Sequence, residues 1–414
     1  MIILKTMISL VTLSILLFGQ SIVASRSFQW PTFGGSPAHT GFIPINLNIE
    51  STTDQVTDPK LVWTGNLTRG LSYSTLFADT LLVTGSSRLT GDSKLFVLNA
   101  LTGKVIHTID LHAASYTGPP VGGFEYMAYV QSVGDLQGIY LQAINLITGD
   151  IKWTARGGAQ WPSYPYGATP GLNYIYMAGG TYNGQLFAVD PYNGTIVFNT
   201  GVVVSSFSCD WWTPTVYNNR VFYNSQPGQG SNGVFGEANP DTGAVLWSVP
   251  LNSEWDGYST YWVPAIMNDI ALVSTRRTYG SIEFHAIGLN SHDILWSYSC
   301  PKASVIVNGS FKDFSPSTDG ISAYFTCADG IHQVRTKSGQ LVKIFSCENC
   351  AGQPIVTKDF LIISSDGNGT MIFNRKSGAI SMHFEESGNL ALHSSAKMLY
   401  ITNSVTGTVF AYAI

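Results

Sequence analysis

The sequence is poor in charge. Lys, Arg, Asp and Glu make up 11% of its 414 residues, and the net charge is −5, whereas soluble domains are typically about 25% charged. Because no segment is rich in Lys or Arg, the chain lacks the basic surface that a nucleic-acid binder needs. We expect instead a neutral or sugar-like ligand, or an extracellular protein, as the partner.

Long apolar runs are also missing from most of the chain. Lys5, the apolar run 8–18 and the small residues Ala24 and Ser25 predict a secretory signal peptide over residues 1–24. No later stretch approaches 18 uninterrupted apolar residues, so we expect a secreted protein with no membrane span in the mature chain. Long helical patterns rich in Ala, Leu, Glu and Lys are absent as well.

Metal and redox motifs are scarce. The eight histidines show no HExxH or similar spacing, and the single CxxC, Cys347 to Cys350, supplies only two ligands unless His332 or His393 lies close by. In an oxidising compartment one or two disulfides are plausible, with one thiol left over. The candidates are Cys300, Cys327, Cys347 and Cys350, with their connectivity open, and Cys209 is the fifth cysteine.

A repeated phrase dominates what is present. Residues 186–198, LFAVDPYNGTIVF, predict a strand, a tight turn at Gly194 and a second strand. The phrase recurs with its turn at Gly103, Gly149 and Gly243, and in more divergent form at His292, Gly339 and Gly378. The spacings of 46, 45, 49, 49, 47 and 39 residues are typical of four-stranded propeller blades.

The two ends of the chain supply one further copy jointly. Residues 407–414 match the first half of the phrase, and residues 60–66 match its second half. We therefore predict an all-β fold, an eight-bladed β-propeller of four-stranded antiparallel blades over residues 60–414, closed by pairing of the N- and C-terminal strands. Seven blades would require discarding one divergent copy. We expect residues 25–59 to pack on the propeller as an N-terminal arm, and the protein to be a monomer.

Two residue types recur at fixed places in the repeat. Four tryptophans stand four residues after the turn glycine or at the equivalent position, where large rings can wedge neighbouring blades together; they are Trp63, Trp153, Trp247 and Trp296. Prolines recur before the first strand of each unit, where a missing amide donor does least damage; they are Pro120, Pro170, Pro214, Pro264, Pro316 and Pro354. Both sets have structural tasks.

The repeat phrase resembles the pyrroloquinoline-quinone repeat of the quinoprotein-like propellers. The segment WPTFGGSPAHTGF, residues 30–42, is similar to the stretch that precedes their first blade. The resemblance covers nearly the whole mature chain and implies the eight-bladed fold, but the family includes both dehydrogenases and cofactor-free scaffolds. For a dehydrogenase, the resemblance implies a Ca²⁺ ion held by Glu, Asn and Asp oxygens and often a disulfide between adjacent cysteines. This chain has no adjacent Cys-Cys pair.

The loops that lead into the innermost strands, here called the lead-in loops, are rich in aromatic residues. In a propeller these loops share one face with the loops between the second and third strands, and binding residues concentrate on such loops. We predict a funnel there, lined by Tyr166, Trp211, Trp212, Tyr261 and Trp262, with Asp210, Asp256, Arg276 and Asp313 as polar contacts. Packing of the aromatic rings against one another is the alternative.

Four sequons predict glycosylation if the host glycosylates: Asn66, Asn193, Asn308 and Asn368. From these features we expect a non-enzymatic binding propeller without a cofactor, whose aromatic funnel takes a carbohydrate, a small molecule or a protein. The alternative is a dehydrogenase of alcohols or sugars that uses pyrroloquinoline quinone with Ca²⁺. A third possibility is glycoside hydrolysis by Asp210 and Asp256.

Overall fold

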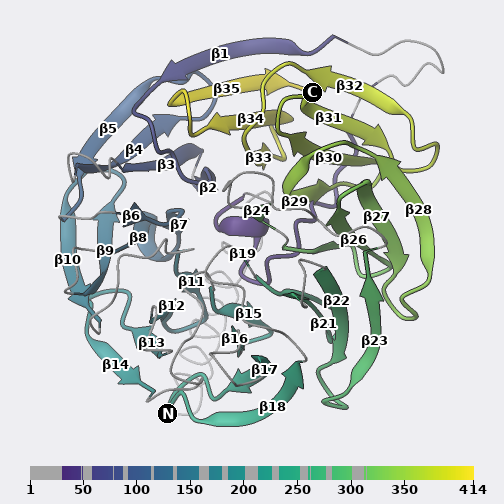
Figure 1. Ribbon diagram of the computed structural model, residues 1–414. Coiled ribbons are helices and arrows are strands. Elements are labelled where there is room, and N and C mark those ends of the chain that lie inside the picture. The colour runs from purple at the N-terminus through teal and green to yellow at the C-terminus, as the bar shows by residue number, and fades with distance from the viewer. Residues whose placement is uncertain are drawn as a thin grey trace, which may run out of the picture.

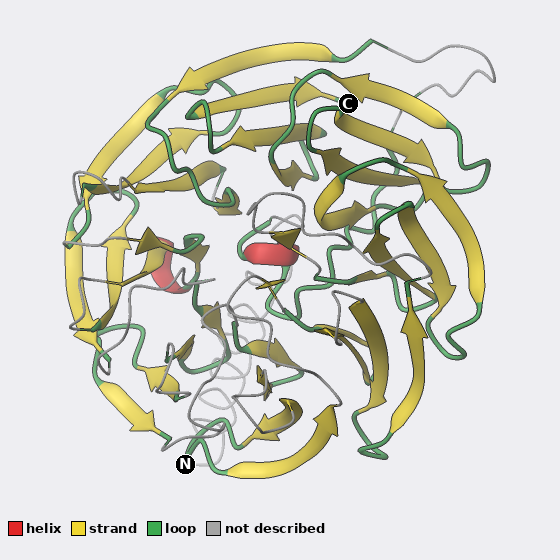
Figure 2. Ribbon diagram, in the orientation of Figure 1, coloured by secondary structure: helices red, strands yellow, loops and turns green. Residues whose placement is uncertain are grey.

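The chain forms a ring of eight blades around a central axis (Figure 1). The computed structural model describes residues 30–47, 49, 58–77, 79–86, 92–112, 116–133, 138–157, 167–179, 185–200, 213–225, 233–251, 260–261, 263–276, 282–300, 312–313 and 315–414. Among these residues the helices are two short 3₁₀ turns, η1 (Phe33–Gly35) and η2 (Phe124–Tyr126) (Figure 2). No helix in the described part is long and apolar enough to span a bilayer.

The blades follow one another in sequence, each running from an inner to an outer strand. Blade 1 is β2 (Thr75–Phe77), β3 (Thr80–Ser86), β4 (Ser93–Asn99) and β5 (Val105–Asp110). Blade 2 is β6 (Tyr116–Thr117) and β7 (Val121–Gly122), which both pair with β8 (Met127–Val133), then β9 (Ile139–Asn145) and β10 (Ile151–Arg156). Blade 3 is β11 (Thr169–Pro170), β12 (Ile175–Ala178), β13 (Leu186–Val189) and β14 (Ile196–Asn199). Blade 4 is β15 (Thr215–Tyr217), β16 (Arg220–Ser225), β17 (Gly233–Ala238) and β18 (Val245–Leu251).

The second half of the ring repeats the arrangement. Blade 5 is β20 (Ala265–Met267), β21 (Ile270–Arg276), β22 (Ile282–Gly288) and β23 (Ile294–Ser299). Blade 6 is β25 (Ser317–Thr318), β26 (Ser322–Cys327), β27 (Gly330–Arg335) and β28 (Leu341–Ser346). Blade 7 is β29 (Cys350–Val356), β30 (Phe360–Ser365), β31 (Gly369–Asn374) and β32 (Ile380–Phe384). Blade 8 is β33 (Asn389–His393), β34 (Met398–Asn403), β35 (Thr408–Ala413) and, outermost, β1 (Lys60–Asn66).

Closure of the ring occurs in blade 8, as the terminal half-copies of the repeat predict. The strand β1 runs antiparallel to β35, with Lys60 opposite Ala413 and Asn66 opposite Thr408. Because the first strand of the chain completes the last blade, blade 8 cannot form without both ends. The prediction of eight four-stranded blades closed by the terminal strands is confirmed.

The repeated turn has the same geometry in blade after blade. In blade 3 the Asp190 carboxylate accepts hydrogen bonds from the amides of Tyr192, at 2.8 Å, and Asn193, at 3.2 Å. Gly194 then adopts a φ of 76°, which costs glycine little and other residues more. The same amide pattern is formed by Asn99, Asn145, Asn239, Asn374 and Asn403.

Neighbouring blades are joined at these turns. Trp63 donates its indole N–H to the carbonyl of Ala100 in the turn of the next blade, at 2.9 Å. Equivalent bonds run from Trp153 to Pro191 and from Trp296 to Thr336. Two of the residues that replace the tryptophan keep the bond: they are His107, which contacts the Ile147 carbonyl, and Lys343, which donates to the carbonyls of Arg375 and Lys376. Trp247 differs, because its indole donates to Glu237 within its own blade.

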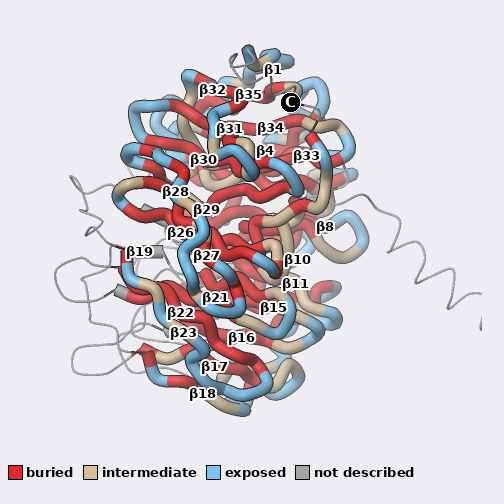
Figure 3. Tube along the Cα trace, turned by 90° about the vertical axis from the view of Figure 1, so that its right-hand side faces the viewer, coloured by how far each residue is buried: buried red, intermediate tan, exposed pale blue. Residues whose placement is uncertain are grey.

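Buried tyrosines of the second strands also donate to turns of the next blade. Tyr400 donates to Ala100 O at 3.0 Å, Tyr129 to Pro191 O at 3.1 Å, and Tyr176 to Pro240 O at 2.9 Å. Burial raises the pKa of all three phenols, so they remain protonated donors at neutral pH. Apolar clusters fill the space between the blades (Figure 3).

Candidate functional site

Most of the predicted funnel lies outside the described residues. This holds for Tyr166, Asp210, Trp211, Trp212, Asp256 and Trp262. The backbone of the other three is described: Tyr261 lies in β19 (Thr260–Tyr261), Arg276 ends β21, and Asp313 lies in β24 (Lys312–Asp313).

Two of these residues are brought together. The strands β19 and β24 pair in parallel, with Tyr261 opposite Asp313, and they lie near the axis of the ring (Figure 1). Figure 3 shows β19 at one face of the disc. The segments that lead into blades 5 and 6 are therefore joined over the axis, at the face where the sequence predicts the funnel.

The axis itself is filled by the segment Trp30–Phe42, here called the plug. Backbone carbonyls of the plug accept hydrogen bonds from the innermost strands of six blades, in the order 1, 2, 4, 5, 6 and 7. The pairs are Trp30 with Leu76, Pro31 with Gly122, Pro37 with Val216, Ala38 with Ile266, Thr40 with Thr318, and Gly41 with Val356, at 2.6 to 3.0 Å. The plug thus circles the axis at one level and ties the inner strands together, with η1 at the centre of Figure 1.

The plug buries the imidazole of His39. His39 is fully buried, with Nδ1 2.7 Å from the Phe33 carbonyl and Nε2 3.2 Å from the Pro214 carbonyl and 3.3 Å from the Thr169 hydroxyl. Burial lowers the pKa of His39, against the opposing effect of the two carbonyls. Gln353 donates to the carbonyls of His39 and Pro316. These contacts make His39 a structural residue.

Sequence reasoning missed a buried acid and imidazole pair in blade 5. Glu283 and His285 stand at alternate positions of β22, with 3.6 Å between Glu283 Oε2 and His285 Nε2. His285 also contacts the hydroxyls of Thr275, at 2.9 Å, and Ser297, at 2.8 Å. The signal was a carboxylate within an otherwise apolar strand, IEFHAIG, which sequence analysis overlooked.

A second polar chain joins blades 5 and 6. The Tyr298 hydroxyl lies 2.6 Å from His332 Nδ1, and His332 Nε2 lies 2.8 Å from Asp329 Oδ1. Burial raises the pKa of Tyr298, and the charge of Asp329 adds to the effect.

Two disulfides are formed by the four candidate cysteines. One joins Cys300 to Cys327, and the other joins Cys347 to Cys350.

The described residues show no cluster of acidic or histidine side chains for a calcium ion. Such an ion needs several converging oxygens, and no group of three or more His, Cys, Asp or Glu side chains in the described part is placed to share one. Glu237 is held by Arg220 and the Trp247 indole. Glu283 is occupied by its own blade, where it accepts from Ser299.

Three of the four sequon asparagines are exposed. Asn193 and Asn368 lie in turns, whereas Asn66 is the last residue of β1. Asn308 lies outside the described residues.

Comparison with known proteins decides the family. The family model described as "Outer membrane protein assembly factor BamB" matches residues 161–384, more than half of the chain. The chain belongs to this family of pyrroloquinoline-quinone-repeat propellers. No curated protein matches its sequence significantly.

Solved structures share the fold of this repeat family at low sequence identity. BamB from Moraxella catarrhalis has a TM-score of 0.63 at 14% identity, covering 86% of this chain and 100% of that one. A europium-containing methanol dehydrogenase has a TM-score of 0.66 at 10% identity, covering 94% and 99%. The quinohemoprotein alcohol dehydrogenase ADHIIG from Pseudomonas putida HK5 has a TM-score of 0.65 at 11% identity, covering 95% and 81%. At these identities the likeness shows the fold alone.

Proposed function

We propose that this repeat-family member is a secreted, glycosylated and monomeric binding propeller without catalytic activity, which engages a carbohydrate, a small molecule or a protein through its lead-in loop face. The observation that carries the proposal is the plug. The plug residues Trp30, Phe33 and His39 are at most 3% exposed, so they are not accessible to a ligand. A ligand would therefore contact the loops around the axis. The pairing of β19 with β24 supports a shared face there.

Secretion is supported by the two disulfides, which persist in oxidising compartments. Glycosylation is supported by the exposed asparagines Asn66, Asn193 and Asn368. Signal-peptide cleavage near residue 24 places the start of the mature chain a few residues before the plug. Mass spectrometry of the secreted protein would reveal the new N-terminus and the occupied sequons.

The test of binding compares substitutions on the two faces. The variants Trp211→Ala and Trp262→Ala abolish or strongly weaken binding on a glycan array or to a captured protein partner, while Tyr192→Ala, an exposed aromatic residue of the opposite face, leaves it unchanged. Saturable binding of pyrroloquinoline quinone with Ca²⁺, accompanied by dye reduction with alcohols or sugars, would overturn the non-enzymatic proposal.

A further inference from the structure

Cations gather on the face opposite the lead-in loops, in blades 6 and 7. In each blade the turn between the first two strands and the turn between the last two lie on this face, because successive strands alternate in direction. These turns and the adjoining strand β28 carry Arg335, Lys337, Lys343, Lys358, Arg375 and Lys376. The whole chain has only 21 Lys and Arg and a net charge of −5, so the basic cluster stands out from the rest of the molecule.

Contacts hold the basic turns close together. Lys343 Nζ donates to the carbonyls of Arg375, at 3.0 Å, and Lys376, at 2.6 Å. Arg375 Nη1 donates to the carbonyls of Thr357, at 2.6 Å, and Lys358, at 2.8 Å. The two turns of blade 7 are thereby fixed beside each other and beside blade 6.

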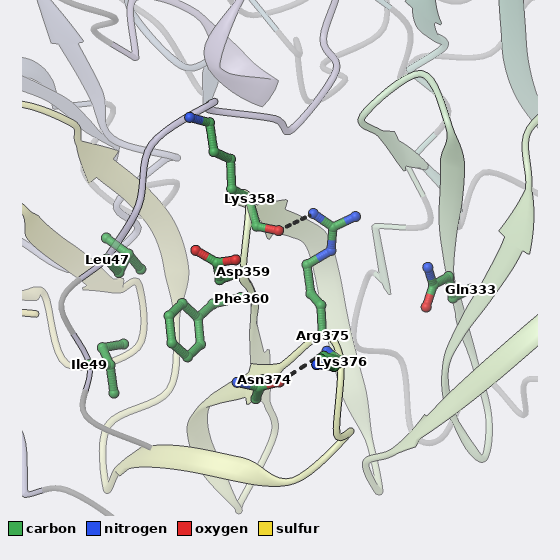
Figure 4. A pocket seen from close by; sticks show the side chains of 9 residues that line it. All are labelled: Leu47, Ile49, Gln333, Lys358, Asp359, Phe360, Asn374, Arg375 and Lys376. Atoms are coloured by element: carbon green, nitrogen blue, oxygen red, sulfur yellow. Dashed lines mark hydrogen bonds between the residues drawn. The ribbon is translucent and has the colours of Figure 1, made fainter. Parts of the chain in front are cut away.

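A pocket of about 520 Å³ lies between these turns and the segment that leaves the plug (Figure 4). Its apolar wall consists of Leu47, Ile49 and Phe360, which are 5%, 9% and 3% exposed. Since those side chains are already covered, the surface open to a ligand is mainly polar. It is provided by Gln333, Lys358, Asp359, Asn374 and Lys376.

The cationic side chains of this pocket differ in whether they are free to bind an anion. Arg375 is neutralised by an ion pair with Asp319 and also donates to the Tyr324 hydroxyl. Its role in the pocket is therefore structural. Lys358 and Lys376 are exposed, and neither forms an ion pair with any described residue. Two ammonium groups are therefore available to an anion, against the single carboxylate of Asp359.

We propose that this pocket binds an anionic sugar, one that carries a sulfate, phosphate or carboxylate group. The anionic group is held by Lys358 or by Lys376, whose side chains lie in different parts of the pocket (Figure 4), since charge-assisted hydrogen bonds are the strong ones. The sugar hydroxyls meet Asn374 Nδ2, Gln333 Oε1 and the Asp359 carboxylate; the first two atoms have no partner among the described residues. A volume of about 520 Å³ exceeds many times the roughly 30 Å³ that one water molecule occupies, so the site suits a sugar better than a bare ion.

The test uses calorimetric titration with a heparin-derived sulfated disaccharide, glucose 6-phosphate and glucuronate, and with uncharged maltose for comparison. At least one anionic sugar binds and maltose binds at least about tenfold more weakly, the affinity falls as salt is raised, and the double variant Lys358→Gln/Lys376→Gln loses at least about tenfold in affinity. The control Lys60→Gln/Lys104→Gln alters two exposed lysines elsewhere and changes the net charge equally.

Three results would overturn the proposal: equal losses in the two double variants, binding of maltose as tight as that of the anionic sugars, or no binding of any anionic sugar. An oligoglutamate peptide that binds while all the sugars fail would assign the pocket to acidic proteins instead. Trp211→Ala serves as a separate control, because it weakens ligands of the lead-in face and leaves this pocket intact. Failure of one site is thus distinguishable from failure of the other.

Discussion

At the scale of single residues, the turn glycine of the repeat performs two tasks. Gly194 takes a φ of 76°, and a β-carbon placed on it would lie 2.6 Å from Cε3 of Trp153 in the preceding blade. Gly103 meets Trp63 and Gly339 meets Trp296 in the same way. His292 replaces the glycine in blade 5. It keeps the positive φ, 59°, and its ring stacks on Trp247 with ring centroids 4.3 Å apart.

These two tasks can be separated by substitution. Gly194→Ala introduces both left-handed strain, about 1–2 kcal/mol, and overpacking against Trp153, about 1–3 kcal/mol. Gly367→Ala introduces the strain alone, because its φ is 86° and nothing lies within 4 Å of the added carbon. Chemical unfolding should show the larger loss of stability for Gly194→Ala. Equal losses would mean that Trp153 moves aside at no cost.

At the scale of the structural element, the joint between blades depends on carbonyls that accept twice. Ala100 O receives Trp63 Nε1 and the Tyr400 hydroxyl, and Ala100 is fully buried. Removing one donor leaves the other in place, whereas removing both leaves a buried carbonyl without a partner.

We therefore expect a non-additive double-mutant cycle. Trp63→Phe and Tyr400→Phe should each cost about 0.5–1.5 kcal/mol beyond any packing change, and the double variant should cost about 1 kcal/mol more than their sum. Trp296→Phe combined with Tyr400→Phe is the matched control, since Trp296 donates to a different carbonyl, Thr336 O. If the losses in stability are additive for both pairs, the two donors to the Ala100 carbonyl act independently and the prediction is wrong.

The repeat phrase predicted these elements because its information is local. Strand alternation, the Asp190 or Asn turn and the glycine all act within about a dozen residues, and the half-copies at the two ends predicted the closure. The place of the plug at the axis, the Glu283 and His285 pair and the pocket beside Arg375 could not be predicted. Each of them depends on which residues from distant blades meet, and no periodic pattern records that. The predicted funnel stays a prediction, apart from the backbone pairing of Tyr261 with Asp313.

At the scale of the whole molecule, the plug contacts the inner strands of six blades, and His39 makes this contact sensitive to pH. Burial lowers the pKa of His39 in the folded state below the ordinary value for histidine. The unfolded chain therefore takes up a proton that the folded chain does not, so the stabilising contribution is present above about pH 6.5 and declines as pH falls below it. His393, whose pKa burial also lowers, acts in the same direction.

Thermal unfolding between pH 7.5 and pH 5 tests this coupling. The wild-type midpoint should fall with acidification, because the free energy of unfolding decreases by at most about 1.4 kcal/mol per pH unit for each proton taken up. His39→Asn, which suits the positive φ of 52° at this position, should lower the midpoint at neutral pH but flatten the slope, with the residual slope due in part to His393. Phe33→Leu is the matched control, because it loosens the plug without removing a titrating group and should shift the midpoint equally at every pH. Parallel profiles for wild type and His39→Asn would show that acid acts on the propeller elsewhere than at its axis.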